Sequence, residues 1–299
     1  MFQVPSAGFW VGPATRTHLL TRNPEPGTWN GDSMERLGII AGGGPLPIIA
    51  AREARAQGLR VVAVAIEEAA SLDLAGEVDA ISWVGAGQLG RLMAALRREQ
   101  VADVVMLGKI PLTLLFSRVK TDLEGIMFYL KLKDRRGDSI LSAVRDVLTR
   151  EGITLHDCRR FLSSIVISKG LLTARAPGAE EQRDIKFGRE IARAIAGLKI
   201  GQTVVVKRCA VVAVESIEGT DATIRRGGAL ANGGVVVVKV GSPDQDMRFD
   251  LPVVGPDTIA ALEEAGATAL ALDADQTLMV DQDAVVKHAD RLGLAIVAD

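Results

Sequence analysis

Cysteine and histidine are scarce in this chain, and their scarcity narrows the chemistry open to it. The two cysteines, Cys158 and Cys209, lie far apart and fit neither a disulfide framework nor a zinc site. We therefore expect buried free thiols in a reducing compartment. The three histidines form no metal-binding spacing. Since a G-x-S-x-G nucleophile elbow and an evident Cys–His pairing are also lacking, the sequence argues against most covalent hydrolases.

The chain also lacks an excess of either charge and any long apolar run. Lys and Arg number 35, Asp and Glu number 37, and the isoelectric point is near 6.0. Without a basic excess to neutralise phosphates along a duplex, the chain is not expected to bind nucleic acid. No run approaches the ~20 apolar residues of a spanning helix, so we expect no membrane span.

Residues 1–33 differ in composition from the rest of the chain. They mix Pro, Gly, Thr and Arg without periodicity and lack the apolar region of a secretory signal. Met34 then opens MERLGIIAGGG, which is typical of a natural protein start. We interpret residues 1–33 as a disordered extension or a mis-called start, with a transit or regulatory segment as the alternative.

What the sequence has in abundance is short apolar segments that alternate with amphipathic ones. Apolar residues make up 48% of the chain. Almost wholly apolar strands between helices are typical of a parallel sheet covered on both faces. In the first half, the expected strands are 36–41, 60–66, 79–85, 103–110 and 152–157, and the expected helices are 47–57, 88–100 and a stretch over 112–150.

The order of expected strands and helices changes after residue 170 and predicts a second α/β domain. A hairpin is expected over 202–216, turning around Lys207–Cys209. We divide the chain into an N-terminal parallel-sheet domain at 34–168 and a C-terminal α/β domain at 169–299. The other expected elements of the second domain are the helices 178–198, 259–267 and 282–293, the strands 235–240 and 294–298, and two short strands within 269–280.

A glycine-rich turn joins the first expected strand to the first expected helix. GIIAGGGPLPIIA, residues 38–50, places three glycines at 42–44 directly after the strand. This is a Rossmann-like arrangement, and its helix N-terminus can receive an anion. Because Pro47 stands where G-x-G-x-x-G needs its third glycine, contact with a phosphate or nucleotide and an ordinary tight turn both stay open. NAD binding, with Glu67 or Glu68 on a ribose, is a further alternative.

The segment EGTDATIRR, which begins at Glu218, combines acids with arginines. Glu218 and Asp221 would project from one turn and hold a divalent cation. Arg225 and Arg226 follow one helical turn later, where guanidinium groups can hold phosphate. The ordinary alternative is that Thr220 or Asp221 caps the helix that follows. The segment therefore predicts either phosphoryl chemistry or a helix cap.

A second group of acids follows the expected strand 235–240. Asp250 stands between two apolar residues in a stretch that returns to the core, where an unpaired carboxylate is costly. It is therefore the strongest acid candidate for a functional role, although a loop of acids can also be solvated. The other charged residues around this loop are Lys239, Asp244, Asp246 and Arg248.

Five segments together resemble one known family. They are LGIIAGGGPLP, GKI, RRGDSILSAV, IGQTVVVKRCAVVAVESIEGTDATIRR and DMRFDLPVVGPDTI, in this order. The chain resembles the two-domain UDP-2,3-diacylglucosamine pyrophosphatases of lipid A biosynthesis, from Met34 to the end. The resemblance implies Mg²⁺- or Mn²⁺-dependent hydrolysis of UDP-2,3-diacylglucosamine to UMP and 2,3-diacylglucosamine 1-phosphate. It also implies a site between the two domains, the second of which would be catalytic.

The candidate residues named above are assigned individual roles in this reaction. Asp221 and Asp250 would be catalytic and would hold the metal together with Glu218 and Asp246. The diacylated substrate implies a cytoplasmic enzyme that is peripheral at the inner membrane of a Gram-negative bacterium, and a homo-oligomer stays open. The residues assigned to the substrate are Gly42, Gly43, Gly44, Pro45, Leu46, Lys109, Thr220, Arg225, Arg226, Lys239 and Arg248.

Two other functions compete with this hydrolase. A non-catalytic Rossmann-type nucleotide sensor would bind a nucleotide and release no UMP. An NAD-dependent dehydrogenase would bind NAD, which distinguishes it from both. A purely structural two-domain scaffold is disfavoured, because the acids cluster in two short segments of the second domain.

Overall fold

The computed structural model describes residues 35–110, 120–132, 137–242, 248 and 251–299. Met34–Asp299 forms one compact unit, and the elements below all belong to it. The segment 1–33, interpreted above as an extension, lies outside the described residues, as do Asp244, Asp246 and Asp250.

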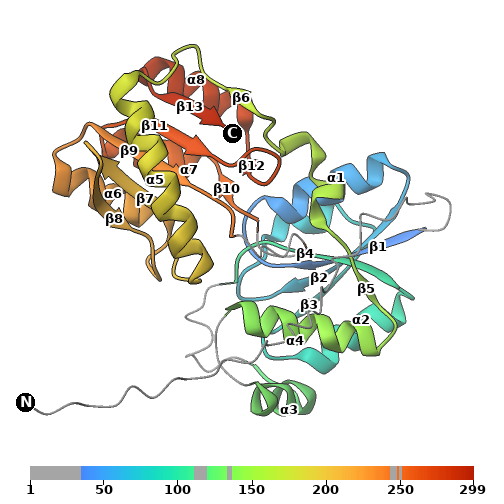
Figure 1. Cartoon of the computed structure of the whole chain (residues 1–299). Helices are drawn as coiled ribbons and strands as arrows, with labels where there is room; N and C mark the ends of the chain where they lie inside the picture. The colour runs from blue at the N-terminus through green and yellow to red at the C-terminus, as the bar shows by residue number, and fades with distance from the viewer. Residues whose placement is uncertain (1–34, 111–119, 133–136, 243–247, 249–250) are drawn as a thin grey trace, which may run out of the picture. The chain divides into compact units, whose positions relative to one another are not determined.

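The N-terminal domain, blue to green in Figure 1, is built on a five-stranded sheet. Its strand order is β3 (Ala80–Val84), β2 (Arg60–Ile66), β1 (Arg36–Ala41), β4 (Asp103–Leu107) and β5 (Thr154–Leu155), and all neighbours are parallel. The order reverses between β1 and β4, which makes this the topological switch point of the sheet. The helices are α1 (Leu46–Ala56), α2 (Leu89–Arg98), α3 (Leu123–Lys131) and α4 (Gly137–Arg150).

Helices cover both faces of this sheet, as the apolar strands predicted. Alternate residues of β1 separate into two buried clusters, with Leu37 and Ile39 in one and Ile40 in the other. The first cluster includes Ala50 of α1, and the second includes Leu92 of α2 and Leu148 of α4. The expected strands are confirmed, although the last of them is only two residues long. In the stretch expected to be helical over 112–150, the described residues form two separate helices, and residues 112–119 and 133–136 lie outside the described part.

The C-terminal domain, yellow-green to red in Figure 1, has a six-stranded mixed sheet. Its order is β6 (Gly170–Leu171), β13 (Ala295–Ala298), β11 (Ala267–Leu272), β9 (Val235–Lys239), β7 (Thr203–Lys207) and β8 (Ala210–Val214). The strands β13, β11 and β9 are parallel to one another, and the pairings on either side are antiparallel. A small parallel pair joins β10 (Val253–Val254) to β12 (Leu278–Met279).

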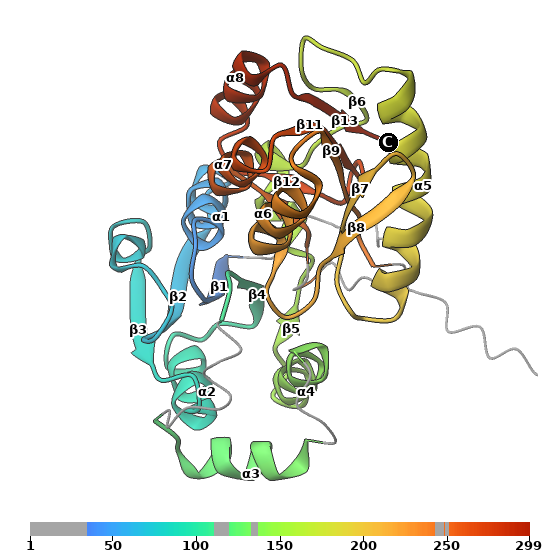
Figure 2. The same ribbon diagram turned by 90° about the vertical axis from the view of Figure 1, so that its left-hand side faces the viewer.

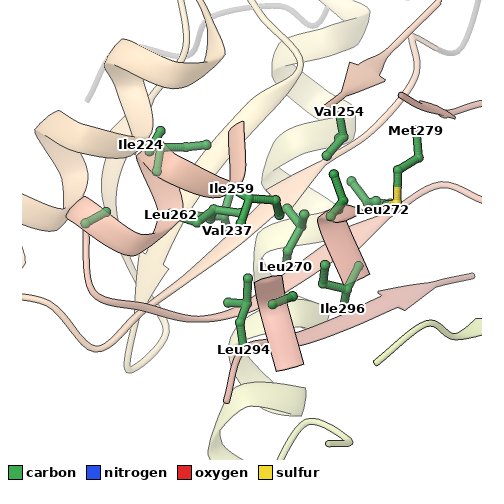
Figure 3. Packing of buried hydrophobic residues seen from close by; sticks show 14 of the residues in the cluster. Ile224, Val237, Val254, Ile259, Leu262, Leu270, Leu272, Met279, Leu294 and Ile296 are labelled. Carbon is green, nitrogen blue, oxygen red and sulfur yellow. The ribbon is translucent and has the colours of Figure 1, made fainter. Parts of the chain in front are cut away.

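Helices also cover both faces of the second sheet. On one face, α5 (Ala179–Gly197) packs Ile185 and Ala192 against valines of β7 and β9. The other face is covered by α6 (Thr220–Ala231), α7 (Pro256–Glu264) and α8 (Gln282–Leu292). Figure 3 shows Ile224 of α6 and Ile259 of α7 in the cluster that also holds Val237 of β9. The second α/β domain is therefore confirmed.

The predicted hairpin of β7 and β8 is confirmed, and it corrects one expectation. Its turn residues, Arg208 and Cys209, both have positive φ angles, 51° and 56°, as a two-residue hairpin turn requires. This turn leaves the Cys209 side chain exposed, whereas Cys158 is buried. The expectation of a buried thiol is therefore confirmed for Cys158 and wrong for Cys209.

An ion pair at the start of α5 should make stability depend on acid pH. Arg175 Nη1 and Nη2 each lie 2.8 Å from a carboxylate oxygen of Glu181, and the Gly178 N–H donates to Glu181 Oε2 at 2.6 Å. The hydrogen bonds from Arg175 are the main cause that lowers the pKa of Glu181 from 4.5 to about 2. Because the folded state has the lower pKa, the stabilisation is complete above the unfolded pKa and is lost as pH falls through the folded pKa.

We expect Glu181→Gln to weaken this acid dependence. The wild-type free energy of unfolding should fall as pH drops from 4.5 to about 2, and the variant should fall less over the same range. Urea unfolding at pH 3, 5 and 7 measures this difference. Glu180→Gln is the matched control, because Glu180 is exposed and its Oε1 lies 3.9 Å from Arg183. Equal pH slopes for the Glu181 variant and the wild type would contradict the prediction.

Candidate functional site

The first candidate region lies at the switch point of the N-terminal sheet, where β1 and β4 end. Ligands of open α/β sheets bind outside the carboxyl ends of strands at such a point. The Gly43 N–H donates to the Lys109 carbonyl oxygen at 2.8 Å, and the Lys109 N–H donates to the Gly43 oxygen at 2.9 Å. The structure therefore brings together the glycine turn and Lys109, which sequence reasoning had assigned separately to the substrate.

The glycines of this turn let neighbouring loops approach one another. A Cβ on Gly42 would lie 2.8 Å from the Lys109 oxygen, and a Cβ on Gly43 would lie 2.8 Å from the Ala69 oxygen. Because Gly42 also donates its N–H to Leu107 at 2.7 Å, the amides of both glycines are engaged by backbone carbonyls. The prediction that they face a phosphate does not fit this arrangement. Gly44, with a φ of 90°, is exposed and has open space beside it.

The N-terminus of α1 offers few donors to an anion. Pro45 and Pro47 have no N–H, and the Ile48 N–H donates to the Pro45 oxygen at 3.1 Å. The Leu46 amide is the donor that remains in this first turn. The exposed side chain of Lys109 can supply positive charge at the switch point.

The two acids that follow β2 are engaged within the N-terminal domain. Glu67 Oε2 lies 2.6 Å from Lys120 Nζ, and Glu68 Oε2 accepts a hydrogen bond from the Ala86 N–H at 3.0 Å. A ribose would have to displace these partners. The geometry therefore gives no support to the alternative in which Glu67 or Glu68 binds the ribose of NAD.

The second candidate region lies at the carboxyl edge of β9 in the C-terminal domain. Lys239 ends this strand and is only 5% exposed. Its Nζ donates to Thr220 Oγ1 at 2.8 Å, and the Thr220 hydroxyl donates to Glu215 Oε1 at 2.9 Å. Since Thr220 is the first residue of α6, this hydrogen-bonded chain places a buried cation at the start of a helix. Two predicted substrate residues, Thr220 and Lys239, are thus in direct contact.

Lys239 occupies an unusual position for a buried cation. The N-terminus of a helix carries a partial positive charge, so a second positive charge there is destabilising. Lys207 shows the ordinary arrangement at the other end of α6, where its Nζ donates to the oxygens of Ala231 at 2.8 Å and Gly233 at 2.7 Å. Glu215 offsets part of the charge around Lys239. The buried amine and the helix N-terminus together fit a phosphate group.

Asp221 lies where the first turns of two helices meet. Its Oδ1 accepts a hydrogen bond of 3.1 Å from Thr258 Oγ1, and Thr258 is buried in the first turn of α7. The N-cap of α6 is Gly219, which has a φ of 84° and makes no side-chain cap. The prediction that Thr220 or Asp221 caps α6 is therefore wrong, because both follow the cap: Thr220 donates to Glu215, and Asp221 accepts from Thr258.

The structure does not bring the two predicted arginines to this point. Arg225 Nε lies 2.6 Å from Glu264 Oε2, and Arg226 Nη2 lies 2.5 Å from Glu218 Oε1. The Glu218 backbone N–H and then Arg226 lower the pKa of Glu218. Both arginines are exposed. They would have to leave these ion pairs to hold a diphosphate, and Glu218 would have to leave Arg226 to hold a metal.

The described residues do not form a metal site by themselves. They contain no group of three or more His, Cys, Asp and Glu side chains that could hold a metal ion. Two of the four predicted ligands, Asp246 and Asp250, lie outside the described part, and Arg248 between them is half-buried. Of the predicted ligands, Asp221 lies in the first turn of α6, next to Thr220, which accepts the hydrogen bond from the buried Lys239 amine.

A buried ion pair fixes the backbone just after β9. Asp273 Oδ2 accepts the Gly241 N–H at 3.0 Å, and its Oδ1 lies 2.7 Å from Arg189 Nη1 on α5. Arg189 also donates to the Leu272 oxygen at 2.9 Å and pairs with Asp299 at 3.0 Å. Arg189 and Asp273 are both buried. The chain that continues toward Asp250 therefore leaves the sheet from a fixed point.

Sequence reasoning missed four residues of this region. Glu215 and Thr258 are part of the segments that carry the family resemblance, but the sequence does not reveal their contacts. The structure shows that Glu215 accepts the Thr220 hydroxyl and that the Thr258 hydroxyl donates to Asp221. Asp273 follows a predicted strand, which was an available signal because ligands gather at the carboxyl ends of parallel strands. Arg189 lies on an amphipathic helix and has no distinguishing sequence signal.

Family comparisons match both domains of this two-domain α/β protein. Residues 36–165 match the LpxI N-terminal domain, and residues 168–297 match the LpxI C-terminal domain. The chain belongs to the LpxI family. This confirms the resemblance seen in the sequence and the two-domain α/β fold class.

A curated relative covers almost the same length. UDP-2,3-diacylglucosamine pyrophosphatase LpxI of Caulobacter vibrioides is 34% identical over 278 residues, which are 88% of this chain and 97% of the relative. Among solved structures, a biotin carboxylase complex with β,γ-ATP from Campylobacter jejuni matches 66% of this chain and 42% of its own at 12% identity, with a TM-score of 0.27. Glycinamide-RNase-transformylase T from Mycobacterium tuberculosis matches 60% and 44% at 16% identity, with a TM-score of 0.23. The chain spans less than half of either solved chain, and scores this low support no conclusion.

Proposed function

We propose that this chain hydrolyses the diphosphate of UDP-2,3-diacylglucosamine to UMP and 2,3-diacylglucosamine 1-phosphate, a step of lipid A biosynthesis. The proposal rests on the 34% identity to a pyrophosphatase over 97% of that enzyme's length. The arrangement around Lys239 supports it, because a buried amine at a helix N-terminus fits the negative charge of a diphosphate.

The two candidate regions would have different roles, one binding the diphosphate and the cation and the other the nucleotide. Lys239, with Thr220 and the first turn of α6, would stabilise negative charge on the diphosphate as its bond breaks. Asp221 and Asp250 would hold the divalent cation, which neutralises the phosphates and activates water when it is bound. Gly44 and Lys109 at the switch point of the N-terminal sheet would contact the nucleotide.

We also place the enzyme in the cytoplasm at the inner membrane surface of a Gram-negative bacterium. The two acyl chains of the proposed substrate hold it in a bilayer. Within the residues that the structure describes, no helix combines the length and the apolar character needed to cross one. The proposed association is therefore with the membrane surface.

The direct test is product release by the purified chain. Incubation with UDP-2,3-diacylglucosamine dispersed in detergent, with Mg²⁺ or Mn²⁺, should produce UMP and 2,3-diacylglucosamine 1-phosphate, detected by chromatography and mass spectrometry. Binding of the nucleotide without any UMP would favour the sensor. Binding of NAD with hydride transfer would favour the dehydrogenase.

We expect activity to require a divalent cation. The diphosphate carries negative charge that must be neutralised as the leaving group departs, and the metal ligands predicted from the sequence are carboxylates, which suit Mg²⁺ and Mn²⁺. Excess EDTA should abolish UMP release, and added Mg²⁺ or Mn²⁺ should restore it. A melting curve in EDTA controls for unfolding. Full turnover in excess EDTA would exclude metal dependence.

A further inference from the structure

Helix α3 carries four large apolar side chains that face solvent. Leu123, Ile126, Met127 and Leu130 are 69%, 47%, 48% and 79% exposed. Their spacing of three and four residues places them on one side of the helix, and we call them the α3 stripe. None of the four packs in the hydrophobic clusters formed by the described residues.

The opposite side of α3 fixes the helix to its domain. Gly125 is buried, and a Cβ there would lie 1.8 Å from the Gly87 oxygen, so only glycine allows this approach. Asp122 Oδ1 accepts the Gly125 N–H at 2.8 Å, and its Oδ2 accepts the Arg91 N–H of α2 at 3.0 Å. Figures 1 and 2 both show α3 at the edge of the N-terminal domain, beyond α2 and α4. The α3 stripe therefore lies on the side of the helix opposite to its attachment, and faces away from the domain.

The sequence around α3 is basic, although the whole chain has a net charge of −2. An apolar helix face within a basic stretch of sequence is a combination that binds the surface of an anionic bilayer. Residues 118–136 contain six basic residues, Arg118, Lys120, Lys131, Lys133, Arg135 and Arg136, against Asp122, Glu124 and Asp134. Of these six, Lys120 pairs with Glu67, and Arg118, Lys133, Arg135 and Arg136 lie outside the described residues.

We propose that the α3 stripe inserts into the boundary between headgroups and acyl chains of an anionic bilayer. This inference rests on the proposed function, because a diacylated substrate is found in a bilayer and the enzyme must reach it there. With nine residues, α3 is too short to span, since a crossing needs about 20. The stripe instead lies in the plane of the interface and holds the N-terminal domain against the lipid surface.

The test compares a stripe variant with a matched control on vesicles without substrate. The double variant Ile126→Glu and Leu130→Glu places two charges in the stripe. The control is Leu72→Glu and Leu198→Glu, at positions that are 78% and 71% exposed on other parts of the chain. On vesicles of phosphatidylglycerol, the stripe variant should bind at least ~100-fold more weakly than the wild type, about tenfold for each apolar side chain lost. The control should bind as the wild type does, and melting curves should show all three proteins folded.

Three outcomes would overturn the inference. One is equal vesicle binding by the stripe variant and the wild type. Another is equal binding of the wild type to vesicles of phosphatidylglycerol and of neutral phosphatidylcholine, which would show that attraction to anionic lipid does not contribute to binding. The third is a smaller oligomer of the stripe variant in sedimentation with unchanged vesicle binding, which would make the stripe a contact between copies of the chain.

A second assay separates this inference from the proposed function. With substrate in detergent micelles, the stripe variant should release UMP at the wild-type rate, and with substrate in vesicles it should be slower. If the wild type released no UMP in either form, the proposed function would fail. The vesicle-binding comparison would still decide the role of the α3 stripe, since it uses no substrate.

Discussion

Replacing Lys239 by methionine is expected to lower kcat/KM for UDP-2,3-diacylglucosamine by ~10²–10³, the usual loss when one preorganised donor to a developing anion is removed. Methionine has nearly the length of lysine and fills the same buried space. The change removes the hydrogen bond from Nζ to Thr220 Oγ1 without opening a cavity. The protein should therefore stay folded with only a small loss of melting temperature, because one hydrogen bond contributes about 0.5–1.5 kcal/mol of net stability.

Lys207→Met is the matched control, because Lys207 serves the other end of the same helix. Its Nζ holds the carbonyl oxygens of Ala231 and Gly233, so its loss should cost about 1–2 kcal/mol of stability. Its activity at a temperature where it stays folded should remain close to wild type. Activity therefore separates the two variants, because only Lys239→Met should lose it.

Steady-state UMP release and a melting curve for each variant measure both effects. Because negative charge increases as the diphosphate bond breaks, we expect most of the Lys239→Met loss in kcat rather than in KM. If Lys239→Met loses stability and keeps its turnover, the amine is structural, and the phosphate-binding role proposed for the edge of β9 is withdrawn.

The fold was largely predictable because its strands are buried on both faces. A run such as VVVVK at 235–239 is typical of a strand buried on both faces, and the structure buries every residue of it. Helix boundaries followed from local signals such as Pro47 in the first turn of α1 and Gly58 just after this helix. These signals act between residues near in sequence, so the sequence alone reveals them.

The candidate site was less predictable because its contacts join distant segments. The glycines at 42–44 indicate close approach by some group, but the sequence does not say whether this group is a phosphate or a peptide carbonyl. The structure places the carbonyl of Lys109 there. Arg225 and Arg226 were assigned to phosphate by residue type. Their observed ion-pair partners are Glu264 of α7 and Glu218 in the turn before α6. These pairs form only because α6 packs beside α7 and follows that turn, which the residue types do not reveal.

Replacing Asp250 by alanine is expected to lower kcat by at least ~10³, about 4 kcal/mol of transition-state stabilisation. Asp250 lies outside the described residues, but the chain beside it is fixed. The Pro252 oxygen accepts the Leu278 N–H at 2.9 Å, and Leu251 packs against the cluster of apolar residues around β1 and α1. A carboxylate next to this apolar packing needs a partner, and a divalent cation is the natural one.

Asp244→Ala is the control for Asp250→Ala, because Asp244 stands six residues before Asp250 in the same acidic segment and farther in sequence from Leu251 and Pro252. Both variants should stay folded, and the Asp244 variant should keep most of its turnover. If Asp250 holds the cation, the Asp250 variant should also need more Mg²⁺ or Mn²⁺ for half-maximal activity, while its affinity for the substrate largely survives through Lys239 and Thr220. Kinetics over a range of metal concentrations, with a melting curve for each protein, measure these effects. A folded Asp250→Ala protein with near-native turnover would remove this acid from the mechanism and leave Asp246 as the next candidate in the loop.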